Sequence, residues 1–142
     1  MPTLPRSNSS LLVRTDFTGS DEAWQLMISE AQRENEDGFR AYVDPVSDSA
    51  FDGASWEAVR AAVPANDYDG ALVLFVADTA ALTSPEHPVL VVDLEDSSGK
   101  PPFRCIVSEL WGVENNLNIA NMDWEEFASA TDKDGVFRGF SE

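Results

Sequence analysis

Histidine and cysteine, which often carry nucleophilic or metal chemistry, each occur once in this chain. His87 lies between two prolines in the segment SPEHP, and we interpret it as a surface histidine rather than a general base. Cys105 occupies an inward position of an alternating strand pattern, which predicts a small core residue. No serine lies in a G-x-S-x-G elbow, and the usual phosphate-binding glycine loops are absent. The sequence therefore argues against a hydrolytic triad, a cysteine- or histidine-based zinc site and the common nucleotide cradles.

Four aspartates end apolar, strand-like segments. If the strands are parallel, their carboxyl ends meet at one edge of the sheet, where open α/β sheets bind ligands. Carboxylates that converge there could hold Mg²⁺ through oxygen ligands and retained waters. Aspartate is also favoured in turns and caps, so a purely structural interpretation stays open. The candidate metal ligands are Asp16, Asp44, Asp78 and Asp93.

Three of the nine basic residues lie within predicted strands. Arg14 shares a strand face with Asp16, and Arg40 shares one with Asp44, so pairing with carboxylates accounts for both arginines. The alternative is an anion pocket, in which guanidinium groups bind a carboxylate or a phosphate. The candidate anion ligands are Arg14, Arg40 and Arg104.

A third group of candidates lies in the segment VENNLNIANMDWEEF (113–127), where four asparagines interrupt an apolar helical pattern. Apolar residues from Leu110 to Ala120 recur at helical spacing and predict a core-facing stripe. The opposite side combines a tryptophan with amides, a composition suited to an interface, unless the amides bond the local backbone and another segment covers the tryptophan. The candidate partner-binding residues are Trp111, Asn115, Asn118 and Ile119.

An alternation of strand-like and helix-like segments must position these residues. β-favouring apolar runs predict five strands, and capping residues followed by apolar positions at helical spacing predict four helices. Two runs are almost continuously apolar, which is typical of strands covered on both faces. The predicted strands span 11–16, 39–45, 70–78, 88–94 and 103–107, and the predicted helices follow Ser20, Ser55, Ser108 and Asp123.

This order of elements predicts an α/β fold with a largely parallel five-stranded sheet, helices on both faces and two C-terminal helices. We expect the fifth strand to pair antiparallel with the fourth as an antiparallel edge. The length of 142 residues fits a single domain, expected over residues 11–142 after a disordered lead at 1–10.

The net charge of −17 opposes direct binding to nucleic acids and to anionic membrane surfaces. The single cysteine excludes an internal disulfide, and no window approaches 18 apolar residues. The N-terminal segment MPTLPRSNSS lacks the apolar region of a secretion signal. We therefore expect a cytoplasmic protein that does not enter membranes.

Five stretches carry a resemblance to a known family: LVRTDF, DGFRAYVDPV, LFVADTAALTSPEHPVLVVDL, SELWGVENNLNIANMDWEEFA and DGVFRGF. Together they resemble a family of small acidic actinobacterial proteins catalogued as a domain of unknown function. The likeness spans residues 11 to 140. It implies a bacterial cytosolic origin, and it implies no activity or site residue.

The leading functional hypothesis is a non-enzymatic acidic module, without a cofactor, that docks a protein partner through the tryptophan and asparagine face. The first alternative is a Mg²⁺-dependent enzyme or metal-binding domain that uses the strand-end aspartates. The second alternative is an inhibitor or immunity-type protein whose negative field blocks a basic partner.

Overall fold

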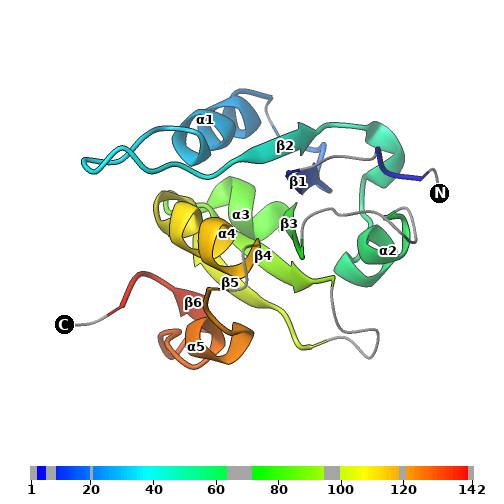
Figure 1. The fold of residues 1–142 in the computed structure, drawn as a ribbon. Helices are drawn as coiled ribbons and strands as arrows, with labels where there is room; N and C mark the ends of the chain where they lie inside the picture. The colour runs from blue at the N-terminus through cyan, green and yellow to red at the C-terminus, as the bar shows by residue number, and fades with distance from the viewer. Residues whose placement is uncertain are drawn as a thin grey trace.

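The computed structural model describes residues 3–5, 9–19, 21–63, 72–94, 100–118 and 121–140. Within these residues, six strands form one mixed sheet in the order β2-β1-β3-β4-β5-β6 (Figure 1). Strand β4 is antiparallel to both of its neighbours, β3 and β5, and all other adjacent strands pair in parallel. The strands are β1 (Ser10–Arg14), β2 (Val43–Val46), β3 (Val73–Ala77), β4 (Pro88–Asp93), β5 (Phe103–Ile106) and β6 (Val136–Phe137).

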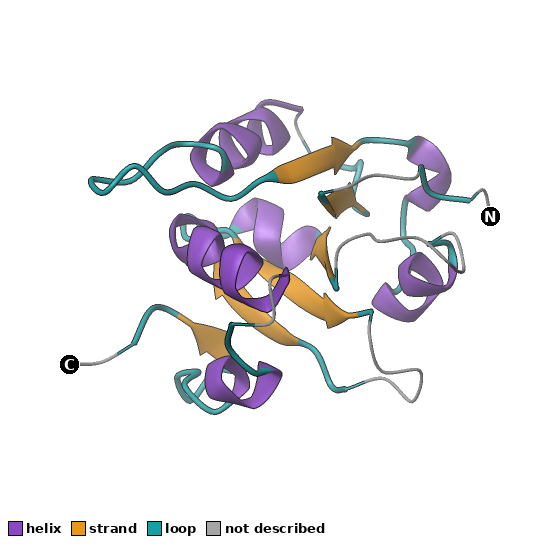
Figure 2. Cartoon of the chain, viewed as in Figure 1, coloured by secondary structure: helices purple, strands orange, loops and turns teal. Residues whose placement is uncertain are grey.

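Helices pack around these strands (Figure 2). One hydrophobic core joins one face of the sheet to α1, α3, α4 and α5, and a second core joins the other face to α2 and η1. In β3, for example, Phe75 enters the first core, whereas Leu74 and Val76 enter the second, as the two-residue period of a strand requires. The helices are α1 (Asp21–Ala31), η1 (Ser49–Phe51), α2 (Trp56–Ala61), α3 (Thr79–Thr83), η2 (Val107–Glu109), α4 (Leu110–Asn118) and α5 (Trp124–Ala128).

The prediction of a mixed α/β domain with helices on both faces is confirmed. The prediction that an almost continuously apolar strand is covered on both faces is confirmed for β3, which is buried at every residue. The antiparallel strand, however, is the internal strand β4 and not an edge strand. The reason is the connection between β3 and β4, which contains only the five-residue helix α3. A parallel crossover needs about a dozen residues or more, so this shorter connection returns the chain antiparallel.

Two further elements differ from the prediction. The short strand β6 adds a sixth strand to the sheet, in a segment where no strand was predicted. Strand β2 begins at Val43 and not at residue 39. Residues 39–42 lie outside the sheet. Their backbone groups bond instead to α4, to Asn35 and to Ala31. Among the described residues, no helix is long and apolar enough to cross a bilayer.

Leu4 lies within the segment that was expected to be a disordered lead, and it is one of the residues of that segment that the structure describes. Its side chain is 2% exposed and belongs to the core beneath α2, and its N–H donates to the carbonyl of Ala62 at 2.8 Å. Leu4 is therefore held by burial of its apolar side chain and by one backbone hydrogen bond.

We expect Leu4→Ala to lower the free energy of unfolding by about 2 kcal/mol, because the substitution removes a buried leucine side chain. Leu26→Ala is the matched control, since Leu26 is 60% exposed on α1 and should change stability by less than about 0.5 kcal/mol. Urea denaturation of the three proteins measures both values. Equal stability of the Leu4→Ala variant and the wild type would contradict the packing described here.

Candidate functional site

Helix α4 has the two faces that the sequence predicts, but its polar face contacts other segments of the chain. Leu110, Val113 and Leu117 are buried in the core, as expected from their spacing. Glu114 is also buried, at 6% exposure. A carboxylate so deeply buried requires hydrogen-bond donors, and α4 and the segment before β2 supply them.

Asn118 ties the C-terminal end of α4 to the start of β1 and to the residue before β3. Its Nδ2 donates to the hydroxyl oxygen of Ser10 at 2.9 Å and to Glu114 Oε2 at 3.0 Å. Its Oδ1 accepts the N–H of Leu72 at 2.8 Å. The amide therefore uses both of its donor hydrogens and one acceptor position inside the protein.

Glu114 connects α4 to the segment before β2. Its Oε1 accepts the backbone N–H of Tyr42, and its Oε2 accepts the amide of Asn118. Burial raises the pKa of Glu114 above the usual glutamate value of 4.5, and these two hydrogen bonds offset only part of that effect.

The other asparagines of α4 also bond to the chain itself. Asn115 Nδ2 donates to the carbonyl of Arg40 at 3.0 Å and to the carbonyl of Trp111 at 2.7 Å. Asn116 Nδ2 donates to the carbonyl of Gly112 at 2.8 Å. The donor groups that were expected to face a partner are thus engaged within the fold, and Ile119 lies outside the described residues.

The large hydrophobic side chains that this region exposes are aromatic. Phe39 and Tyr42 are 49% and 51% exposed. Trp111 is half-buried and stacks on Phe39, with ring centroids 5.3 Å apart and ring planes inclined by 14°. We call Phe39, Tyr42 and Trp111 the aromatic surface. The sequence prediction included Trp111 but missed the other two rings, because residues 39–45 were interpreted as strand.

The structure does not bring the four candidate metal ligands together. Asp16 and Asp78 follow β1 and β3 at the carboxyl edge of the sheet. Asp44 lies opposite Leu11 near the start of β1, and Asp93 lies opposite Val73 at the start of β3. Across the described part of the chain, no group of three or more histidine, cysteine, aspartate or glutamate residues could hold a metal ion.

Asp16 and Asp78 also have structural roles. Asp16 Oδ1 accepts the hydroxyl and the N–H of Thr18 at 2.6 and 2.9 Å, and these bonds lower the pKa of Asp16. Asp78 caps α3 by accepting the N–H of Ala81 at 3.2 Å. These contacts match the turn and cap interpretation.

The three candidate anion ligands lie apart and have partners of their own. Arg14 is buried and donates to the carboxylate of Asp21 at 2.7 Å. Arg104 donates to both carboxylate oxygens of Asp78, at 2.7 and 3.0 Å. The Arg40 guanidinium lies 4.8 Å above the ring of Tyr42. Pairing with carboxylates therefore explains two of the three arginines, although Arg14 pairs with Asp21 and not with the carboxylate of Asp16.

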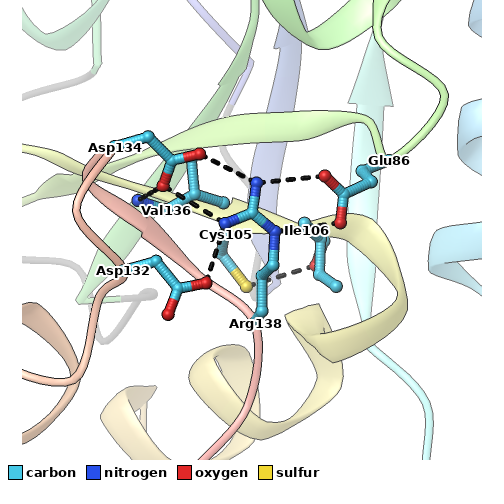
Figure 3. Close-up of polar contacts among 7 residues, drawn as sticks. All are labelled: Glu86, Cys105, Ile106, Asp132, Asp134, Val136 and Arg138. Atoms are coloured by element: carbon cyan, nitrogen blue, oxygen red, sulfur yellow. Dashed lines mark hydrogen bonds and ion pairs between the residues drawn. The ribbon is translucent and has the colours of Figure 1, made fainter.

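A surface ion-pair network on another part of the molecule holds the segment after β6. Arg138 pairs with the carboxylates of Glu86, Asp132 and Asp134 at 2.8 to 2.9 Å (Figure 3). These bonds raise the pKa of Arg138 and lower the pKa of Asp134. The network joins the turn before β4 to the C-terminal segment, so a role in stabilising the fold accounts for these four charged residues. Cys105, close by in the same view, is buried as predicted.

Fold and site together define a small, strongly acidic α/β domain whose exposed aromatic residues are held in place by a buried polar cluster. The chain belongs to the family described as Domain of unknown function (DUF6924), whose profile matches residues 9–140. The expected likeness to a family of unknown function is thereby confirmed. No curated protein matches the sequence.

The pKa values of Glu114 and Asp16 shift in opposite directions, so these two carboxyls predict pH dependences of opposite sign. Glu114 has a raised pKa, so its contribution to stability is present below pH 4.5 and is lost as the pH rises through its folded pKa. Asp16 has a lowered pKa, so its contribution is present above pH 3.8 and is lost as the pH falls. Urea denaturation as a function of pH should therefore show the stability difference between wild type and Glu114→Gln decreasing with pH, and that between wild type and Asp16→Asn increasing. Parallel profiles for the two variants would contradict these assignments.

Proposed function

We propose that this chain is a non-enzymatic binding protein that docks a protein partner through the aromatic surface of Phe39, Tyr42 and Trp111. The observation that carries the proposal is the combination of half-exposed rings with a fixed backbone. Aromatic residues dominate interface hot spots because they bury a large apolar area with few rotatable bonds.

The segment that carries these rings is anchored on both sides. On the α4 side, the carbonyl of Arg40 accepts a hydrogen bond from Asn115, and the N–H of Tyr42 donates to Glu114. On the side of the preceding turn, Asn35 Oδ1 accepts the N–H of Phe39 at 2.9 Å, and the carbonyl of Phe39 accepts the N–H of Asn35 at 2.8 Å. A surface that is ordered before binding loses less conformational entropy when a partner docks.

The proposal assigns the amides and the aromatic rings different roles. Asn115 and Asn118 position the docking segment and the strand starts, and the rings make the contact with the partner. Trp111 does both, because it supports Phe39 by stacking and retains part of its own surface. This division also explains why asparagine, a poor helix former, occurs repeatedly in α4.

The magnesium alternative has less support. It would have to use Asp16 and Asp78 without Asp44 and Asp93, which lie toward the opposite edge of the sheet. Asp78 is already engaged by Arg104 and by the first turn of α3. Among the described residues, no three carboxylates lie close enough together to form an oxygen-rich cation site.

Affinity capture from a lysate of the source organism tests the proposal. The test variant is Phe39→Ala/Tyr42→Ala, and the control is Leu26→Ala, which removes an apolar side chain of α1 that is more exposed than either ring. Proteins captured specifically by the wild type should be retained by the control and depleted about tenfold or more by the double variant, because hot-spot truncations cost about 2 kcal/mol or more.

Thermal unfolding of all three proteins must show that the variants remain folded. A capture profile of the folded double variant identical to that of the wild type would overturn the proposed docking surface.

A further inference from the structure

The chain around the aromatic surface is strongly acidic. Residues 30–44 contain five carboxylates and two arginines, a net charge of −3. Three of the acids, Glu34, Glu36 and Asp37, are exposed in the turn that precedes Phe39. Figure 1 shows this stretch between α1 and β2 as a long excursion that extends beyond the end of α1. The aromatic surface therefore lies beside a projecting acidic turn.

Charge restricts the possible occupants of this surface. A second copy of the chain would bring together two molecules that each carry a net charge of −17, and the same field repels nucleic acids and anionic membranes. A protein with a basic surface is attracted instead, because complementary potentials steer encounter and favour the correct partner.

The aromatic rings favour the same kind of partner. Within the protein itself, the guanidinium of Arg40 lies 4.8 Å above the Tyr42 ring, and that of Arg14 lies 4.3 Å above the Phe17 ring. Guanidinium groups bind aromatic faces through cation–π attraction and stacking, and they pair with carboxylates through two parallel hydrogen bonds. Rings and carboxylates placed side by side thus offer both of the contacts that arginine makes best.

We propose that the aromatic surface and the acidic turn at 34–37 together bind an arginine-rich surface of a cationic protein. This inference rests on the proposed docking function and names the chemistry of the partner. The exposed carboxylates attract the partner and pair with its guanidinium groups. Phe39 and Tyr42 offer these groups the ring surface that Trp111 and Arg40 leave exposed. Binding is consequently fast and weakens steeply with salt.

A nuclear magnetic resonance titration of the full, isotope-labelled chain with a ten-residue arginine peptide tests this inference. We expect the largest shifts at the amides of residues 34–42 and at the indole N–H of Trp111. Glu34→Gln/Glu36→Gln should raise the dissociation constant about fivefold, the change expected from the loss of two exposed ion pairs. The charge-matched control Glu57→Gln/Glu125→Gln, on α2 and α5, should leave the dissociation constant nearly unchanged.

Two outcomes would overturn the inference: shifts spread evenly over the acidic surface, or equal weakening by the two charge-matched pairs. Either would mean that the peptide responds to net charge alone. The docking function fails separately. If Phe39→Ala/Tyr42→Ala loses its captured proteins but the arginine peptide shifts no resonance in residues 34–42, the docking surface stands and its cationic partner is wrong.

Discussion

A buried carboxylate, Glu114, and the amide one helical turn later, Asn118, form the contact on which the rest of this structure depends. Glu114 accepts the N–H of Tyr42, and Asn118 accepts the N–H of Leu72 and donates to the hydroxyl of Ser10. These three groups lie at or just before the starts of three parallel strands. Backbone donors buried without a partner would destabilise the fold. Helix α4 thereby joins the parallel half of the sheet to the segment that carries the aromatic surface.

Local signals in the sequence were sufficient for much of the fold. The apolar run of β3 is buried at every residue, and Asp123 begins α5 with its N–H bonded to Glu126, as the capping pattern predicts. The partners of α4 could not be predicted in this way, because Tyr42 and Glu114 are 72 residues apart. The sequence identified the asparagines of α4 as unusual, but only the tertiary structure shows that their amides bond within the chain itself.

The direction of β4 decides how the acidic residues can act. An antiparallel β4 places Asp93 at the edge opposite Asp78, so the carboxylates act singly as caps and ion-pair partners. The remaining acidic residues give the protein surface its negative electrostatic potential. An acidic surface with a fixed aromatic segment is suited to docking, since the field accelerates encounter and the rings supply a rigid contact.

The most direct test of this account is the hydrogen exchange rate of the Tyr42 amide, measured in the wild type and in Glu114→Ala. If Glu114 holds the segment before β2, this amide is protected about a hundredfold in the wild type and loses that protection in the variant, while amides of β3 stay protected. Exchange of the wild-type Tyr42 amide at the rate of a free peptide would contradict the anchoring of the aromatic surface. Protection that survives the substitution would contradict it equally.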